Sequence, residues 1–183
     1  EKHYKLNSIK MPKEFPQRCC HFPIKLCEEK SQRNKLIVDE VMGFHEKGFP
    51  VLVILFSPNE ISEIEKLIKE HPNFNEGQTI RIYQGNDIKI KPNNDSGKEG
   101  AISLGTNVCG RGTHIEVGKK HLHVIISFYT SNNRALHQAF GRTARKNNFG
   151  SVHIICLKSE FNNGTRMIDD DEVEINLTKM EIY

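Results

Sequence analysis

The sequence predicts an α/β fold with a mostly parallel β-sheet and helices on both of its faces. Segments with strand character alternate with segments in which apolar residues recur at helical spacing, and this alternation is typical of a parallel sheet. The strand segments, of which residues 51–56 are the clearest, are almost entirely apolar. Strands of this kind are buried on both faces, so helices are expected on both sides of the sheet.

The chain is expected to open with an extended lead-in segment over residues 1–30. Three prolines argue against a continuous helix there: Pro12, Pro16 and Pro23. Helical spacing of apolar residues begins near Ser31 and stops at Gly48. The first predicted helix therefore lies directly before the buried strand at residues 51–56.

The remaining elements follow in order. A second helix carries Ile61, Ile64, Leu67 and Ile68 at helical spacing and ends before Pro72. Further strands are expected at residues 79–83, 101–104, 122–128 and 152–157, and a third helix at residues 132–145. Residues 86–100 are rich in Asn, Lys, Asp and Gly and read as a surface loop.

A chain of 183 residues has room for one domain with its own core. We expect that domain to occupy residues 31–160, followed by a tail over residues 161–183. The acidic run at residues 169–172 in this tail reads as a solvated turn.

Composition excludes some classes of protein. No stretch approaches the roughly 18 apolar residues of a membrane span. The net charge of +3 is small and scattered, whereas sequence-independent nucleic-acid binders concentrate positive charge. The chain opens without Met or a secretory signal, so we expect a piece of a longer, cytoplasmic protein.

The five cysteines are expected to be reduced thiols. Their one cluster consists of Cys19, Cys20, His21 and Cys27. Adjacent cysteines rarely ligate one zinc ion together, and no Cys-x-x-Cys pair is present. We therefore expect no metal site in this chain.

A glycine-bearing loop at residues 105–115 follows a predicted strand directly. Gly110 and Gly112 permit close approach of backbone N–H groups to an anion, and Thr113 adds a short hydrogen-bonding side chain. Ligands of parallel sheets bind outside the carboxyl ends of the strands. This loop is a candidate binding site, with a simple tight turn as the alternative.

A second motif spans residues 137–145. Arg142 and Arg145 stand three positions apart, and Gln138 lies one helical turn earlier, so on a helix these side chains share a side. Two parallel guanidinium groups can bind phosphate oxygens and stabilise a transferring phosphoryl group. The alternative is a solvated basic helix end. Gly141, a poor helix former, precedes Arg142.

Two other patterns resemble parts of a nucleotide site without fitting them. Asp39 and Glu40 follow apolar residues as magnesium carboxylates do, but the apolar positions continue at helical spacing, which favours an amphipathic helix. Residues 112–120 contain Gly, Gly and Lys at the wrong spacing for a phosphate loop. The chain therefore lacks its own triphosphate-binding loop.

Together the two motifs resemble motifs V and VI of the helicase superfamily that includes DEAD-box and DEAH-box proteins. The pattern Gln138-x-x-Gly141-Arg142-x-x-Arg145 is the signature of motif VI. The resemblance is closest to SecA, the ATPase of bacterial preprotein translocation. That family has Ala-Thr-Asn-Met-Ala-Gly-Arg-Gly-Thr-Asp-Ile where this chain has residues 105–115, and its Leu-His-Val-Ile strand recurs at residues 122–125.

The resemblance covers roughly residues 34–157 and includes residues 48–53, which look like the start of the family's second nucleotide-binding domain. It implies a RecA-like three-layer domain that binds ATP jointly with a preceding RecA-like domain of the same protein, which would hold Mg²⁺. Arg142 and Arg145 would reach the γ-phosphate at the carboxyl edge of the sheet. Gln138 would position the catalytic water or couple the two domains.

The resemblance also assigns the glycine-bearing loop. Cleft-lining residues, together with Gly141 of motif VI, would be Gly110, Arg111, Gly112, Thr113 and His114. His114 replaces a family Asp that contacts the nucleotide sugar, which removes a fixed acceptor charge. Residues 86–100 replace a helix of the family.

Three functions follow as expectations. The first is the arginine-bearing half of an ATPase that translocates a polypeptide. The second is the same half of an RNA or DNA helicase, since one fold serves both substrates. The third is a non-catalytic interaction module that retains the fold. In each case the fragment alone is expected to bind ATP weakly and not to hydrolyse it.

Overall fold

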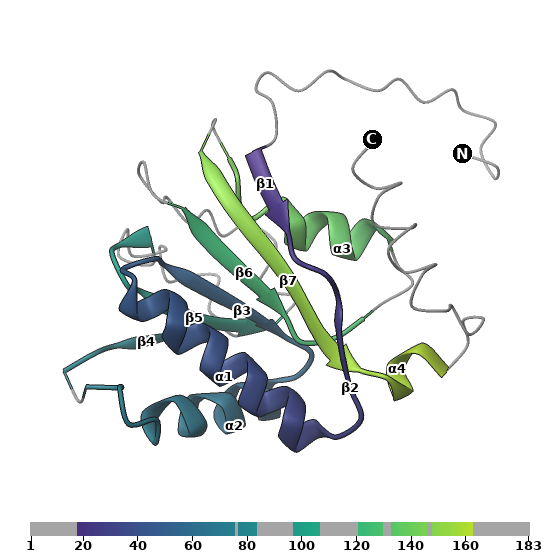
Figure 1. Ribbon diagram of the computed structural model, residues 1–183, viewed down its shortest axis with the longest axis horizontal. Coiled ribbons are helices and arrows are strands. Elements are labelled where there is room, and N and C mark those ends of the chain that lie inside the picture. The colour runs from purple at the N-terminus through teal and green to yellow at the C-terminus, as the bar shows by residue number, and fades with distance from the viewer. Residues whose placement is uncertain are drawn as a thin grey trace.

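The computed structural model describes residues 18–75, 77–83, 97–106, 121–129, 133–145 and 148–162. Over these residues the chain forms a sheet flanked by helices (Figure 1). The elements are β1 (Arg18–His21), β2 (Lys25–Cys27), α1 (Lys30–Glu46), β3 (Val51–Leu55), α2 (Pro58–Lys69), β4 (Ile80–Tyr83), β5 (Ile102–Thr106), β6 (Leu122–Ile126), α3 (Asn133–Phe140), β7 (Phe149–Leu157) and α4 (Ser159–Asn162).

The strands lie in the order β1-β7-β6-β3-β5-β4, and β2 pairs with the carboxyl-terminal part of β7. Every strand pair in this part of the chain is parallel. The predicted fold class, a parallel sheet in an α/β domain, is confirmed. Because all strands point the same way, their amino ends lie at one edge of the sheet and their carboxyl ends at the other.

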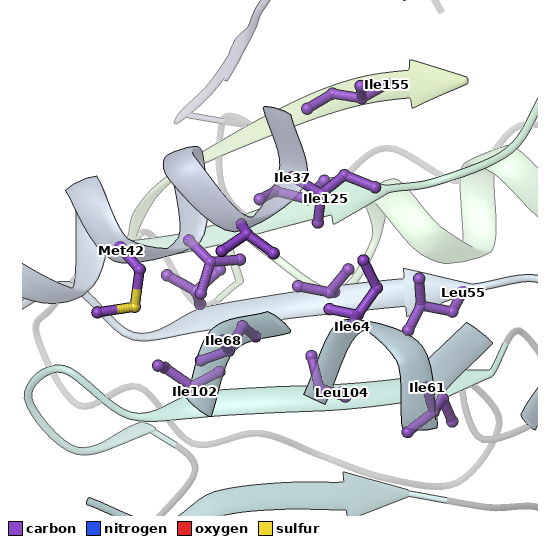
Figure 2. Packing of buried hydrophobic residues seen from close by; sticks show 14 of the residues in the cluster. Ile37, Met42, Leu55, Ile61, Ile64, Ile68, Ile102, Leu104, Ile125 and Ile155 are labelled. Atoms are coloured by element: carbon purple, nitrogen blue, oxygen red, sulfur yellow. The ribbon is translucent and has the colours of Figure 1, made fainter. Parts of the chain in front are cut away.

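Strand β3 lies at the centre and is buried on both faces. Val51, Val53 and Leu55 face one apolar core, whereas Leu52 and Ile54 face the other. Helices α1 and α2 pack against the first core, as Figure 2 shows for the isoleucines of both helices. Helix α3 covers the second core. The uninterrupted apolar run in the sequence is the consequence of this two-sided burial.

Helix α2 begins where local chemistry favours a helix start. The Ser57 hydroxyl accepts a hydrogen bond from the Glu60 backbone N–H at 3.4 Å, and Pro58 occupies the first turn. The predicted helical spacing is confirmed for Ile61 and for Ile64 and Ile68, which are fully buried.

Leu67 departs from that spacing, since it is 38% exposed. It therefore lies outside the buried face of the helix, which Ile61, Ile64 and Ile68 form.

Helix α1 settles the interpretation of Asp39 and Glu40. Both lie within this 17-residue helix, and neither ends a strand. The helical reading of the apolar spacing is confirmed, because Ile37 and Val41 are fully buried on one side of the helix. The carboxylate of Glu40 instead contacts histidines of the sheet.

Residues 18–27 of the predicted lead-in segment are extended, as expected, but they also belong to the sheet. This segment supplies β1 and β2, which pair in parallel with the outer side of β7. Pro23 lies between the two strands, where no strand hydrogen bond has to be donated. Pairing satisfies the backbone groups of β7 that would otherwise form an open sheet edge, a requirement that local sequence does not reveal.

Ser103 offers a test of the core. Its hydroxyl in β5 is fully buried and forms no hydrogen bond to any described residue. Since a buried hydroxyl without a partner costs free energy, Ser103→Ala is expected to leave stability unchanged or to raise it by about 1 kcal/mol. Urea unfolding monitored by circular dichroism measures the change.

Ser151→Ala is the matched control. The Ser151 hydroxyl is equally buried but contacts His121 and His123, each at 2.6 Å. This variant is expected to lose about 1–3 kcal/mol, because its removal leaves buried partners unsatisfied. Equal losses for both variants would contradict the assignment of Ser103 as an unsatisfied group.

Candidate functional site

The predicted arginine pair lies on a turn, not on a helix. Helix α3 ends at Phe140, so the prediction of a helix to residue 145 is wrong at its carboxyl end. Residues 141–145, called the arginine turn below, follow the helix. The Arg142 N–H donates a hydrogen bond to the Ala139 carbonyl at 3.0 Å. Gly141 begins the turn, in keeping with its low helix propensity.

Side-chain contacts close the arginine turn. The Thr143 hydroxyl donates to the Leu122 carbonyl at 2.5 Å, and the Arg145 Nε–H donates to the Gly141 carbonyl. Ala144 adopts a positive φ of 52°, a left-handed conformation that an L-residue adopts at a cost. These contacts bring Arg142 and Arg145 onto one short, folded segment.

The turn lies at the amino edge of the sheet, and the expected position at the carboxyl edge is wrong. Leu122, which receives the Thr143 hydrogen bond, is the first residue of β6. Gly150, near the start of β7, packs against Thr143. The reason is topological: α3 follows β6 and runs back across the sheet, so its end returns to the edge where β6 began (Figure 1).

The two guanidinium groups are partly desolvated and repel each other. Arg142 is 9% exposed and Arg145 is half-buried. Burial lowers the pKa of both side chains, and the positive charge of Arg145 lowers the pKa of Arg142 further. Such mutual influence requires the two cations to be close. Arg145 therefore lies near enough to Arg142 to act on its charge, and both residues lie on the arginine turn.

The other predicted site residues divide into two groups. Gln138 is half-buried on α3, one turn before the arginine turn, and Gly141 opens that turn. The predicted cleft residues of the glycine-bearing loop lie outside the described residues: Gly110, Arg111, Gly112, Thr113 and His114. Strand β5, which leads into that loop, ends at the carboxyl edge as expected.

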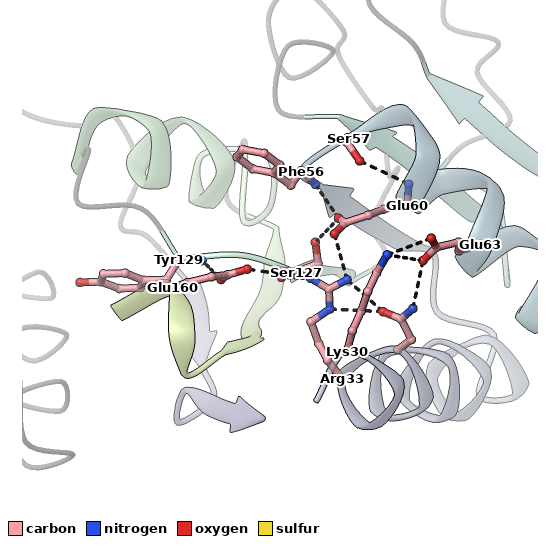
Figure 3. A network of polar contacts seen from close by, with 10 residues as sticks. Lys30, Arg33, Phe56, Ser57, Glu60, Glu63, Ser127, Tyr129 and Glu160 are labelled. Carbon is pink, nitrogen blue, oxygen red and sulfur yellow. Dashed lines mark hydrogen bonds and ion pairs between the residues drawn. The ribbon is translucent and has the colours of Figure 1, made fainter. Parts of the chain in front are cut away.

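A polar network around Arg33 occupies the carboxyl edge (Figure 3) and was not predicted. Arg33, on the first turn of α1, is only 1% exposed. Its guanidinium donates to the Ser127 carbonyl at 3.2 Å and pairs with the Glu60 carboxylate at 3.0 Å. Because such a charge is costly to bury without partners, these contacts fix its position.

The Arg33 network joins three loops that follow strands. Glu60 also accepts the backbone N–H of Phe56 after β3, and Glu160 of α4, after β7, accepts the N–H of Tyr129 at 2.9 Å. Burial raises the pKa of Glu160, against the lowering effect of the Tyr129 N–H and of Arg33. The loops after β3, β6 and β7 are thereby held around one buried cation.

A second unpredicted cluster lies on the α1 face of the sheet. His123 of β6 is fully buried and bonds through Nε2 to Glu40 at 2.7 Å and through Nδ1 to Ser151 at 2.6 Å. His153 of β7 contacts the same Glu40 carboxylate at 2.7 Å. Phe44 stacks on His123 with ring centroids 3.7 Å apart.

The electrostatics of this histidine cluster follow from burial and hydrogen bonding. Burial lowers the pKa of His123 more than Glu40 raises it, and burial also lowers the pKa of His121. Burial tends to raise the pKa of Glu40, but hydrogen bonds from His123 and His153 outweigh it and lower that pKa to about 2. These shifts favour neutral rings at His121 and His123 beside an ionised Glu40 carboxylate.

A sequence signal for both clusters existed. Arg33 stands one helical turn before Ile37 on the apolar side of α1, and His123 interrupts an apolar strand. A polar residue at a position predicted to be buried must find partners in the fold. The identity of those partners, such as Glu40 for His123, depends on which elements become neighbours.

A known protein family matches most of this chain. The family model described as the SecA P-loop domain matches residues 25–153. The chain belongs to the SecA P-loop domain family. This match runs from β2 into β7 and includes the arginine turn, the histidine cluster and the Arg33 network apart from Glu160.

Curated relatives agree with the family. The chain is 28% identical over 116 residues to a protein translocase subunit SecA of Caldicellulosiruptor saccharolyticus, covering 63% of this chain and 13% of that protein. It is 30% identical over 166 residues to protein translocase subunit SecA 3 of Magnetococcus marinus, covering 86% of this chain and 24% of that protein. The chain thus spans a quarter or less of these relatives.

The fold is that of helicase RecA-like domains. A solved structure of Mss116p DEAD-box helicase domain 2 bound to an RNA duplex superposes with a TM-score of 0.57 at 17% identity, covering 76% of this chain and 54% of that one. The predicted RecA-like fold is confirmed by this likeness. Within the described ranges, none of the helices has the length and apolar character needed to cross a membrane.

The histidine cluster predicts a pH-dependent stability. Because the folded-state pKa values of His121 and His123 lie below the ordinary value of 6.5, the unfolded chain binds more protons as the pH falls below 6.5. The free energy of unfolding is therefore expected to decrease between pH 7 and pH 5. Urea unfolding at several pH values measures this slope.

His121→Asn is expected to reduce that slope, whereas His71→Asn, a replacement outside the cluster, serves as the matched control. Because Glu40 has a pKa of about 2, below its ordinary 4.5, its stabilising contribution is lost only as the pH falls from 4.5 toward 2. An unfolding free energy that does not change between pH 7 and pH 5 would contradict this assignment.

Proposed function

We propose that this chain is the second RecA-like half of a SecA-family ATPase motor. In this proposal Arg142 and Arg145 act on ATP bound by the preceding RecA-like half of the same protein. Support comes from the family match over residues 25–153 and from the likeness to a domain that is titled helicase domain 2. The absence of a phosphate-loop sequence in this chain fits a domain that completes a nucleotide site held elsewhere.

The observation that carries this proposal is the pairing of two partly buried guanidiniums on one turn. Burial destabilises the charged form of each guanidinium, and the positive charge of Arg145 destabilises the charge on Arg142 further. A phosphate group placed against both would relieve this cost, since guanidinium and phosphate form strong, charge-assisted hydrogen bonds. Negative charge on a transferring γ-phosphoryl group is stabilised in the same way.

The position at the amino edge is compatible with this role. The rule that ligands bind at the carboxyl ends of strands applies to a domain that binds the ligand on its own sheet. An arginine finger is supplied to a nucleotide that another domain holds, so it can leave the sheet from any surface that faces the cleft.

The remaining site residues take supporting roles in this proposal. Gln138 positions the attacking water or couples the two halves, and Gly141 lets the chain turn close to the phosphate. The cleft is lined by Gly110, Arg111, Gly112, Thr113 and His114. Mg²⁺ is held by the preceding half, and the present chain alone binds ATP weakly.

The polymer that the motor moves is proposed to be a polypeptide. The relatives are described as protein translocase subunits, which favours this substrate. A structural neighbour is described as bound to an RNA duplex, which favours the alternative of a nucleic-acid helicase. A non-catalytic module is the third candidate, because His114 stands where the family has Asp.

Replacing the arginines tests the proposal. In the full-length protein, Arg142→Ala and Arg145→Ala are each expected to lower ATP turnover by roughly a thousandfold, because arginine fingers contribute about that much to catalysis. Lys66→Ala, which removes an exposed cation from α2, is the control and should leave turnover unchanged. If both arginine variants retain normal turnover, the arginines have no catalytic role.

A second measurement separates the candidate functions. ATP turnover of the full-length protein is expected to rise when an unfolded polypeptide is added and to stay constant with single-stranded RNA, because closure of the cleft is coupled to the polymer that the motor moves. Stimulation by RNA alone would assign a helicase. A full-length protein that binds no non-hydrolysable ATP analogue would instead be an interaction module.

A further inference from the structure

We propose that Thr143 and Gly150 are positioning residues. They fix the arginine turn against the sheet and thereby set the orientation of Arg142 and Arg145. This inference rests on the proposed function, because it concerns how the two guanidiniums are held for a phosphate. It adds two residues, neither of which touches the nucleotide.

The first contact ties the arginine turn to the central part of the sheet. Thr143 stands between the two arginines in the sequence and is 3% exposed. Its hydroxyl donates to the Leu122 carbonyl at 2.5 Å. Leu122 belongs to β6, which is fully buried and paired on both sides by β3 and β7. The turn is therefore attached to a rigid strand as well as to the end of α3.

The second contact depends on the absence of a side chain at residue 150. A Cβ atom on Gly150 would overlap the Thr143 hydroxyl oxygen and lie 2.7 Å from the Ala144 backbone nitrogen. Real Cβ atoms do not approach a backbone atom this closely. Gly150 is paired in register with Leu122. The carbonyl that accepts the Thr143 hydrogen bond and the glycine that leaves room for the turn therefore lie side by side on neighbouring strands.

The left-handed residue follows from these two contacts. Ala144, with its φ of 52°, holds a conformation that persists only where surrounding contacts over-determine it. The hydrogen bond of Thr143 fixes the residue before Ala144, and the Arg145 carbonyl after it accepts the N–H of Asn148, next to β7. This reversal lets Arg145 bond back to the Gly141 carbonyl, so both arginines keep a fixed relation to each other.

Rigid support of this kind matters for an arginine finger. Its contribution depends on a guanidinium already placed for the developing charge, and a displacement of about 1 Å can cost roughly a hundredfold in rate. The hydroxyl of Thr143 and the bare backbone of Gly150 are the contacts that would prevent such a displacement.

The test uses ATP turnover by the full-length protein. Thr143→Val keeps the side-chain shape but removes the hydroxyl, and it is expected to lower turnover by about tenfold to a hundredfold. The ratio of the effects on kcat and on KM should match that of Arg142→Ala. Thr143→Ser, which retains the hydroxyl, should restore nearly full turnover. In a variant that lacks both arginines, Arg142→Ala with Arg145→Ala, Thr143→Val should cause no further loss, because no guanidinium remains to be positioned.

Ser103→Ala is the matched control, because it removes a buried hydroxyl from β5 that lies in no part of the proposed site. Its turnover should equal that of the unmodified protein. The inference is overturned if Thr143→Val keeps normal turnover while Arg142→Ala loses it, or if Thr143→Val lowers turnover further in the variant that lacks both arginines. Normal turnover of Arg142→Ala itself would instead overturn the proposed function.

Gly150→Ala perturbs the same contact from the neighbouring strand, and it replaces Thr143→Val as the test if that variant does not fold. Its added methyl group must push the turn away from β7, so turnover should fall with the kcat and KM pattern of Arg142→Ala. Full turnover in a folded Gly150→Ala protein would overturn the inference, because the turn would then have moved without consequence.

Discussion

The parallel pairing of fully buried strands is the constraint on which the rest of this structure depends. Strand β3 has apolar side chains on both faces and hydrogen-bonding neighbours on both sides, so helices must return across the sheet between strands. Because the chain crosses back over the sheet between strands, the amino ends of the strands share one edge and the carboxyl ends share the other. As a result, the polar groups of this domain gather in different places, each with its own chemistry.

Strand β6 connects these places. At its amino end the Leu122 carbonyl receives the hydroxyl of Thr143 and supports the arginine turn. Beyond its carboxyl end, the Ser127 carbonyl receives the buried guanidinium of Arg33. Between them, His123 bonds to Glu40 of α1. A rigid strand with polar contacts near both of its ends is suited to hold loops in a fixed relation, as a domain that works against a second domain requires.

The family relationship places this unit within a larger protein. The chain spans a quarter or less of its curated relatives, and its fold is that of a helicase RecA-like domain. In the proposed motor, the arginine turn on one surface of the domain faces a nucleotide on the other half, while the loops around Arg33 lie at the opposite edge. The parallel sheet thus places the arginine turn and the Arg33 network at opposite edges of the domain.

The sequence by itself determined the α/β class, the buried central strands and the SecA resemblance, because apolar period and motif spacing are local properties. It also paired Arg142 with Arg145. Only the tertiary structure decided that α3 stops at Phe140, that the arginine turn lies at the amino edge, and that residues 18–27 complete the sheet. It also decided the partners of Arg33 and His123. These outcomes depend on contacts between segments far apart in the chain, whose burial and hydrogen-bonding demands are met only when the whole sheet assembles.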